Sequence, residues 1–153
     1  MSDKNYNNLE NEEIMKIKSF HSISEDAIYI RKIVFEDEQG FRDEFDEIDK
    51  IALHMVMYNQ LNEPIATCRV FAGKEKDSYL LGRLAVVKSY RGKKIGSKMI
   101  EEAEKAVKEQ GGKNICLHSQ CRAKDFYAKC GYMPFGEEDE EEGCPHIWMK
   151  KSL

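Results

Sequence analysis

One stretch of the chain, Leu81-Gly-Arg-Leu-Ala-Val-Val-Lys-Ser-Tyr-Arg-Gly-Lys-Lys-Ile-Gly96, carries most of the information about fold and function. Its apolar run Leu84 to Val87 is typical of a β-strand, and a helical pattern starts directly after a Ser-Tyr-Arg-Gly turn. Basic residues gather where that helix begins: Lys88, Arg91, Lys93, Lys94 and Lys98. Free backbone N–H groups and nearby cations at a helix N-terminus favour anions. The stretch therefore predicts a site for a phosphate-bearing ligand.

Hydrophobic periodicity on both sides of this stretch predicts an α/β (α+β) fold, a mixed sheet covered by helices. Strands are expected at residues 14–20, 52–58, 65–72, 79–87, 115–118, 132–135 and 147–150. Helices are expected from a Ser22-x-x-Glu25 capping box to about residue 38, from Ile95 to the glycines at 111–112, and over residues 122–130. Residues 52–72 should form an antiparallel hairpin, and the strand that ends at Val87 should be central because it is apolar on both faces. The acidic segments 41–50 and 137–142 are predicted to be loops.

Length and composition predict a single globular domain at residues 14–153 after a frayed tail at residues 1–13. The chain has 153 residues, of which 41% are hydrophobic and 34% charged. The polar N-terminus has no signal-peptide pattern and no apolar run could span a membrane, so we expect a cytoplasmic protein. The five cysteines form no Cys-x-x-Cys pair and are expected to be reduced thiols. A net charge of −4 argues against general nucleic-acid binding.

Familiar nucleotide and metal motifs do not fit the sequence. A Walker A loop is excluded because Gly92 and Gly96 are separated by only three residues and Lys98 follows Ser97. No Gly-x-Gly-x-x-Gly fingerprint follows an early strand. The histidines at positions 21, 54, 118 and 146 are scattered, so no metal site is predicted. An ordinary helix start with solvated lysines remains the alternative to an anion site.

A second motif lies further along the chain. The sequence Ala123-Lys-Asp-Phe-Tyr127 is followed by Ala-Lys-Cys-Gly-Tyr132, and together with Tyr90-Arg-Gly-Lys-Lys-Ile-Gly96 it resembles the GNAT superfamily of acyl-CoA N-acyltransferases. The family motif is Arg/Gln-x-x-Gly-x-Gly/Ala. Arg91 and Gly96 match its ends, while Lys94 stands at the usual middle glycine. The turn keeps its shape if Lys94 adopts ordinary helical dihedrals.

A narrower resemblance concerns the ElaA/YjcF-type subgroup. It rests on Val34-Phe-Glu-Asp-Glu-Gln39, Asp43-Glu-Phe-Asp-Glu-Ile-Asp49, Ala52-x-His54 and Pro145-His-Ile-x-Met149. The substrates of this subgroup are poorly defined. The resemblance therefore narrows the family and leaves the acceptor open.

The superfamily resemblance implies that acetyl-CoA is the cosubstrate and that the central sheet splays between two strands. Backbone N–H groups of Arg91, Gly92, Lys93, Lys94, Ile95 and Gly96 would hold the pyrophosphate. The pantetheine arm would lie along Leu84, Ala85 and Val86, which requires this strand to diverge from residues 115–118. A backbone N–H of the same strand would polarise the thioester carbonyl. Phe126 borders this cofactor site and is expected to pack in the core.

Catalysis requires a proton donor for the departing thiolate and a proton acceptor for the amine. Tyr127 matches the family's general acid. Glu38, His54 and His118 are open candidates for the base, as is a water relay to a distant carboxylate. His146, Cys121 and Cys130 are expected to pack. The acidic segments 36–49 and 137–142 either attract a cationic amine or, as we favour from the sequence, are solvated loops.

The sequence thus predicts transfer of an acetyl group to a primary amine by direct attack. The amine belongs to a small molecule or a peptide, with neither nucleic acid nor membrane as partner. The alternative is a CoA-binding sensor or interaction module without catalysis. RNA or protein binding through residues 88–98 is a weaker reading, because Tyr90 is the lone aromatic residue nearby. A homodimer is an option that the sequence leaves open.

Overall fold

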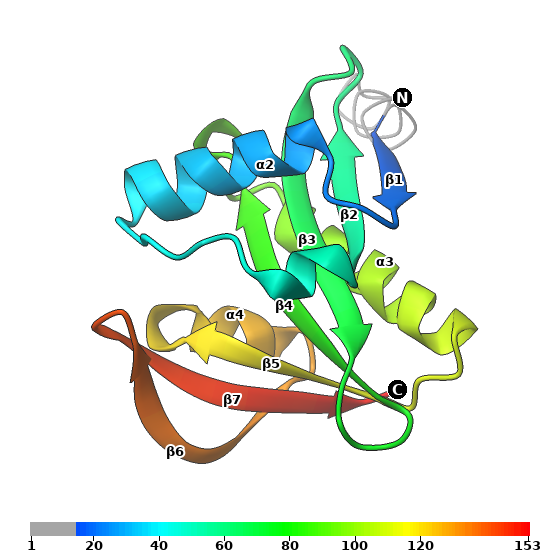
Figure 1. Ribbon diagram of the computed structural model, residues 1–153, viewed down its shortest axis with the longest axis vertical. Coiled ribbons are helices and arrows are strands. Elements are labelled where there is room, and N and C mark those ends of the chain that lie inside the picture. Colours follow the sequence, from blue (N-terminus) through cyan, green and yellow to red (C-terminus); the bar gives the residue numbers. More distant parts are fainter. Residues whose placement is uncertain (1–14) are drawn as a thin grey trace, which may run out of the picture.

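The computed structural model describes residues 15–153, and the elements follow the predicted order (Figure 1). The strands are β1 (Lys16–Phe20), β2 (Leu53–Tyr58), β3 (Pro64–Ala72), β4 (Ser78–Val86), β5 (Asn114–Gln120), β6 (Met133–Glu141) and β7 (Cys144–Ser152). The α-helices are α2 (Glu25–Arg31), α3 (Ile95–Glu109) and α4 (Lys124–Lys129). The shorter helices are η1 (Lys32–Glu38), which continues α2 as a π-helix, and the 3-10 turns η2 (Glu47–Lys50), η3 (Lys88–Tyr90) and η4 (Cys121–Ala123). The tail expected at residues 1–13 lies outside the described residues.

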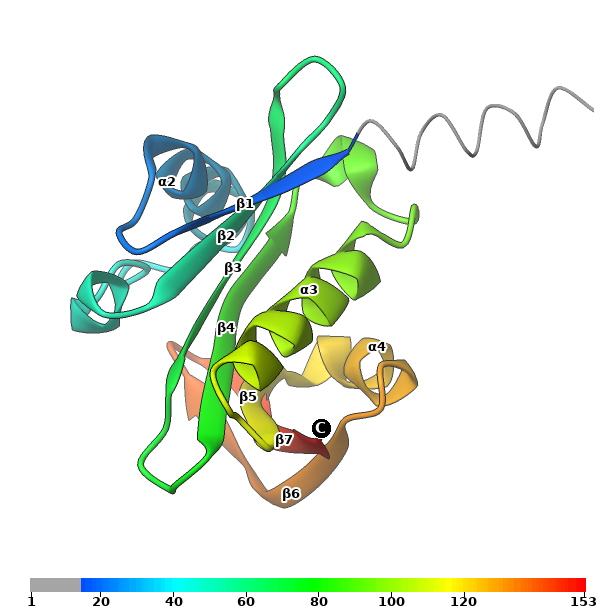
Figure 2. The ribbon, with the colours of Figure 1, turned by 90° about the vertical axis from the view of Figure 1, so that its right-hand side faces the viewer.

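The strands form one seven-stranded sheet in the order β1-β2-β3-β4-β5-β7-β6, so β4 is central as predicted. Every neighbouring pair is antiparallel except β4 and β5, which are parallel. Figure 2 shows α2 on one side of the sheet, with α3 and α4 on the other. The predicted mixed sheet with flanking helices and the hairpin of β2 with β3 are confirmed.

Both faces of β2 are buried against helices, which explains why its residues 55–58 are all apolar. Met55 and Met57 belong to the core beneath α3, whereas Val56 and Tyr58 belong to a second core beneath α2. Neighbouring residues of a strand point to opposite faces, so a strand between two helical layers favours apolar side chains at successive positions. The predicted face of α3 is confirmed, since Ile95, Met99, Ala103 and Val107 are all buried.

Three local predictions were wrong. The helix α2 is capped by Ser24, whose side chain accepts a hydrogen bond from the Ala27 N–H, and not by Ser22. The acidic run 137–142 is not a loop, because β6 extends to Glu141 and pairs with β7. The acidic segment 41–50 contains η2 and two buried carboxylates, Glu44 and Asp49.

The central strands β4 and β5 separate halfway along their length. Their parallel pairing runs from Ser78 opposite Asn114 to Leu81 opposite Leu117, and both strands then continue without each other. A bulge lies at this point in β4, where the register with β3 shifts and Arg83 has a φ of 53°. A bulge bends its strand, which turns β4 away from β5. The predicted splay of the sheet is therefore confirmed.

Candidate active site

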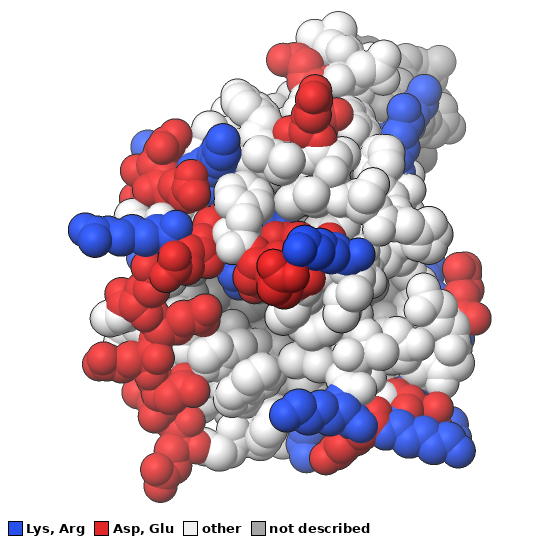
Figure 3. Space-filling model, in the orientation of Figure 1, with Lys and Arg blue, Asp and Glu red and all other residues white. Residues whose placement is uncertain are grey.

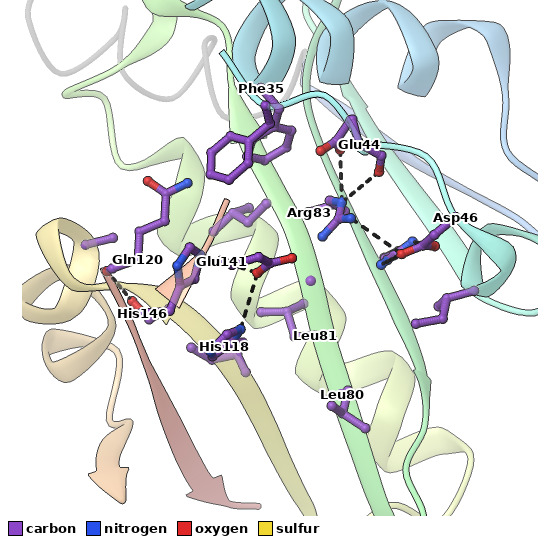
Figure 4. A pocket seen from close by; sticks show the side chains of 18 of the residues that line it. Phe35, Glu44, Asp46, Leu80, Leu81, Arg83, His118, Gln120, Glu141 and His146 are labelled. Carbon is purple, nitrogen blue, oxygen red and sulfur yellow. Dashed lines mark hydrogen bonds and ion pairs between the residues drawn. The ribbon is translucent and has the colours of Figure 1, made fainter. Parts of the chain in front are cut away.

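The gap between the diverging strands opens into a cavity of about 340 Å³. Its wall includes Leu84 from β4, Leu117 and Gln120 from β5, and Tyr127 from α4. The segment 41–46 and the β6–β7 hairpin close the other sides (Figure 4). The topology therefore brings the predicted pantetheine strand and the predicted general acid to one cavity.

The turn between β4 and α3 lies outside the lining of this cavity, at the N-terminus of the longest helix. Lys94 caps α3 with φ 63° and ψ 18°, a left-handed conformation, and no side chain caps this end. The condition set on Lys94, ordinary helical dihedrals, is not met. The lysine instead adopts the conformation that a glycine adopts easily, so the turn keeps its shape at an energetic cost. The first helical hydrogen bond here runs from the Lys98 N–H to the Lys94 carbonyl, so the amides of residues 95–97 carry no bond within the helix.

The guanidinium of Arg91 is held by hydrogen bonds within the protein. Its two terminal nitrogens each lie 2.7 Å from a carboxylate oxygen of Glu38, and its Nε donates to the Val86 carbonyl at 2.9 Å. This ion pair lowers the pKa of Glu38 and raises the pKa of Arg91. Glu38 also lies outside the cavity lining. Both its position and its lowered pKa make it a poor base for an amine in the cavity.

Tyr127 sits beside the cavity with its ring packed against aromatic neighbours. The centroids of its ring and the Phe126 ring are 5.1 Å apart, and the Tyr132 ring meets it edge-on at 6.2 Å. Burial raises the pKa of Tyr127 above its usual value of about 10, so the hydroxyl is protonated at neutral pH. A protonated phenol beside a cavity can donate a hydrogen bond or a proton to a group bound there.

Phe126 connects α4 to the first turn of α3. A Cβ added at Gly96 would lie 3.0 Å from Phe126 Cζ. Phe126 is partly buried against the core and lies outside the cavity lining. The structure therefore agrees with its expected packing role, and it explains why glycine stands at position 96.

His54 was expected to point into or beside the cleft, and this placement is wrong. The side chain is buried, with 1% of its surface exposed, and Nε2 lies 2.9 Å from the Asp49 carbonyl oxygen. Burial lowers the pKa of His54. Because it is outside the cavity lining and already hydrogen-bonded, His54 holds η2 to the sheet.

The segment 41–50 is fastened to the sheet by a buried network of charges that sequence reasoning missed. Arg31 bonds Glu44 at 2.8 Å and Asp49 at 2.7 Å, and Arg69 reaches Asp49 at 2.7 Å. Arg83 contacts Glu44 at 3.0 Å (Figure 4). The solvated-loop interpretation is therefore wrong for Glu44 and Asp49, whose charges are compensated inside the protein. The arginines lie on α2, β3 and β4, so no local pattern could have revealed the network.

Carboxylates remain at the opposite side of the cavity. Asp43, Glu141 and Glu142 line it together with His118 and His146. Glu142, at the tip of the β6–β7 hairpin, accepts the backbone N–H groups of Arg42 at 3.0 Å and Asp43 at 3.4 Å. Figure 3 shows acidic side chains gathered along the side of the molecule where the end of the first helix and this hairpin lie. Of the three candidate bases, His118 alone lines the cavity.

The geometry can be compared with known proteins. The sequence profile described as the acetyltransferase (GNAT) domain matches residues 20–153. The chain belongs to the GNAT acetyltransferase family. This GNAT domain is 40% identical over 134 residues to a Bacillus subtilis protein named "putative acetyltransferase", covering 82% of this chain and 86% of that one. It is 34% identical to the N-acetyltransferase YjcF of the same organism, covering 82% of this chain and 90% of that one.

Solved structures give the same result. The crystal structure of a "putative N-acetyltransferase" from Lactobacillus plantarum superposes with a TM-score of 0.82 at 31% identity, covering 91% of this chain and 98% of that one. Escherichia coli ElaA superposes with a TM-score of 0.79 at 24% identity, covering 90% and 99%. An aminoglycoside 6'-N-acetyltransferase complexed with coenzyme A shares the fold at a TM-score of 0.71 and 18% identity, covering 90% and 96%. The resemblance to the ElaA/YjcF subgroup is confirmed, and this GNAT domain is an N-acetyltransferase. Among the described residues, no helix has the length and apolar character needed to cross a membrane.

Proposed function

We propose that this GNAT domain transfers an acetyl group from acetyl-CoA to a cationic primary amine. The observation that carries the proposal is the separation of β4 from β5 after Leu81 and Leu117 beside Tyr127. The segment Leu84–Val86 lacks a β5 partner, so an extended pantetheine arm can pair with it as an added strand. The coenzyme A complex of the aminoglycoside 6'-N-acetyltransferase of the same fold supports this choice of cosubstrate.

The pyrophosphate would lie at the start of α3. The amides of residues 95–97 have no bond within the helix, and Lys93 and Lys98 add positive charge nearby. Lys94 adopts the left-handed backbone conformation that a glycine would adopt at this position. The turn therefore keeps the shape of the family motif although the middle glycine is replaced. Arg91 offers neither group freely, because its guanidinium is bound to Glu38 and its backbone N–H donates to the Lys88 carbonyl at 3.3 Å. The amides of residues 95–97 would therefore carry the phosphate contact.

Tyr127 would protonate the departing thiolate. The ammonium group first gives one proton to His118, the candidate base that lines the cavity, or to a water relay. The free amine then attacks the thioester carbonyl, the resulting oxyanion takes a hydrogen bond from a β4 backbone N–H, and the C–S bond breaks. The sulfur leaves as a thiolate and receives the Tyr127 proton. The second proton lost by the nitrogen returns through solvent to the Tyr127 oxygen. Burial keeps the Tyr127 hydroxyl protonated in the resting protein, so a proton is available when the thiolate forms, although the same burial makes the phenol a weaker acid.

The acceptor would enter from the side that carries Asp43, Glu141 and Glu142. The arginines at the cavity, Arg69 and Arg83, are compensated by Glu44, Asp46 and Asp49. The carboxylates of the hairpin side therefore dominate the potential at the entrance, which favours an ammonium group. The sequence alone favoured solvated loops for these acidic segments, whereas the proposal assigns their carboxylates at the cavity to attraction of the amine.

The test has two parts. Acetyl-CoA should raise the melting temperature, since a ligand at 100 times its Kd adds about 2.7 kcal/mol to the stability. A panel of amines should then include acceptors that cause release of CoA thiol, with cationic polyamines and amino sugars ahead of neutral amines. Absence of stabilisation at millimolar acetyl-CoA would overturn the proposal. Stabilisation without thiol release across the panel would favour the CoA-binding module instead.

A further inference from the structure

Two histidines and a carboxylate converge at the wall of the cavity. His118 lies on β5, His146 on β7 and Glu141 on β6, and one ligand atom from each lies within 4.8 Å of the other two. Glu141 Oε2 is 3.4 Å from His118 Nδ1 and 3.6 Å from His146 Nε2. Figure 4 shows the three side chains directed toward one another. Both rings therefore present a nitrogen to the same carboxylate.

The outer nitrogen of each ring is hydrogen-bonded away from this cluster. His118 Nε2 lies 2.7 Å from Asp139 Oδ1, and His146 Nδ1 lies 2.8 Å from the Cys144 carbonyl oxygen. A carboxylate and a carbonyl only accept, so each outer nitrogen carries the hydrogen. In the neutral rings, His118 Nδ1 and His146 Nε2 then present lone pairs. Two lone pairs and a carboxylate oxygen face one another, and a cation between them would satisfy all three.

The spacing distinguishes between kinds of cation. A direct N–H···O bond spans about 2.7–3.2 Å, which is shorter than the 3.4 and 3.6 Å between the rings and Glu141. An ammonium group that bonds three acceptors at about 2.8 Å would hold them roughly 4.6 Å apart. A tetrahedral ion with bonds of about 2.0–2.1 Å places its ligand atoms roughly 3.3 Å apart. The two distances to Glu141 are closest to the metal geometry.

We propose that His118, His146 and Glu141 bind a divalent transition-metal ion of the zinc type. Two imidazoles and one carboxylate are a donor set that Zn²⁺ accepts. The bonds to Asp139 and the Cys144 carbonyl fix the orientation and tautomer of the rings, as such contacts do around metal-binding histidines. All three donors line the cavity, so the remaining coordination position opens toward it.

A bound ion would join three strands. Glu141 and His146 belong to the β6–β7 hairpin and His118 to β5, so the ion would fix the hairpin that forms the acceptor side of the cavity. It would also occupy the His118 Nδ1 lone pair, so this histidine would not serve as a base in the metal-loaded protein. The inference goes beyond acetyl transfer, and binding can be measured without acetyl-CoA or amine.

Trp148 provides a direct readout of binding. It is the one tryptophan of the chain, and its ring stacks on His118 with centroids 4.7 Å apart and planes at 21°. The full chain is treated with a chelator, then titrated with CoCl₂ while the Trp148 emission is recorded, and with ZnCl₂ by calorimetry. We expect saturable quenching by Co²⁺ and one Zn²⁺ per chain, with Zn²⁺ reversing the quenching. Failure of the wild-type chain to bind Zn²⁺ at micromolar concentrations would overturn the proposal.

Variants separate a built site from general attraction to acidic residues. Glu141→Gln removes one donor from a side chain with 46% of its surface exposed, so folding should be retained. We expect Zn²⁺ affinity to fall at least about tenfold in Glu141→Gln and His146→Gln, and about 10–100-fold in Asp139→Asn. Glu140→Gln removes the same charge from the neighbouring position on β6 and should bind like the wild type. Equal affinity of the Glu141→Gln and Glu140→Gln variants would also overturn the proposal.

Discussion

Glu38 and Arg91 form a bidentate ion pair that joins the end of η1 to the turn before α3, with both nitrogen–oxygen distances at 2.7 Å. The two residues are 53 positions apart in sequence. One was a candidate base and the other the first residue of the predicted acetyl-CoA motif. Their contact changes both assignments. The pKa of the Glu38 carboxylate is lowered, so it is a weaker base, and the Arg91 guanidinium is paired and not available to a phosphate.

We expect Glu38→Gln to strengthen CoA binding about two- to fivefold, because the released Arg91 charge becomes available to phosphate. Both side chains are more than a third exposed, so stability should change by less than about 1 kcal/mol. The measurement is the Kd of CoA by calorimetry at two salt concentrations. Asp37→Asn, an exposed neighbour, is the control. Loss of CoA affinity in Glu38→Gln would show that the pair positions Arg91 for binding.

Tyr127→Phe should lower kcat at least about 100-fold while changing the Kd of CoA less than about threefold. In the proposed mechanism the hydroxyl acts on the departing sulfur, whereas the ring alone supports packing. Because burial raises the Tyr127 pKa, activity should show no loss from tyrosine ionisation below about pH 10. The matched control is Tyr132→Phe, whose buried hydroxyl has no hydrogen-bond partner in residues 15–153. Equal losses in kcat and CoA affinity would assign Tyr127 to structure.

Lys94→Gly should stabilise the protein by about 0.5–1 kcal/mol. A left-handed lysine costs about 1–2 kcal/mol, and part of this gain is offset by the greater freedom of glycine in the unfolded chain. Urea denaturation gives the free energy of unfolding. Lys93 is not among the described residues with positive φ, so Lys93→Gly should be destabilising instead. Equal effects of the two substitutions would contradict strain at Lys94.

Gly96→Ala should destabilise the protein by about 1 kcal/mol and lower activity. The new methyl group would lie 3.0 Å from Phe126 Cζ and push α4, which carries Tyr127, away from α3. Phe126→Leu should remove the clash, so a double-mutant cycle should show a favourable coupling of about 0.5 kcal/mol or more. Additive free energies of unfolding would mean that the two positions do not interact.

Asp49→Asn should cost about 3–5 kcal/mol near neutral pH, because it leaves Arg31 and Arg69 with a neutral partner in a buried site. Hydrogen bonds to the two arginines and to the Asp46 N–H lower the pKa of Asp49 to about 2, against the opposing effect of burial. A lowered carboxyl pKa adds stability above the unfolded value of about 3.9, and this contribution disappears as the pH falls toward about 2. Denaturation curves of both proteins should therefore converge over this range. A difference independent of pH would contradict the role of the charge.

Features set by residues close together in sequence could be predicted, whereas contacts between residues far apart in sequence could not. Helix α3 and the strands β2 to β4 follow from local periodicity, and the prediction of an anion site at the turn rests on residues 91–96. The chain also carries the Phe126–Tyr127 pair as a recognisable motif. These features rest on neighbours in sequence, whose side chains share a face of one element.

The contacts around the cavity depend on strand order instead. His118 and His146 looked scattered in sequence, but the antiparallel pairing of β5 with β7 puts Gln120 opposite His146 and Trp148 opposite His118. Glu141 joins them because β6 extends through the acidic run. The ion pair of Glu38 with Arg91 and the contacts of Asp49 with two arginines could not be predicted for the same reason, since the partners lie on different elements. The sequence by itself determined the family, and it predicted the acyl-CoA turn and Tyr127 as site residues. Only the tertiary structure decided which charges meet, because each partner sits on a different element and the fold alone sets their distance.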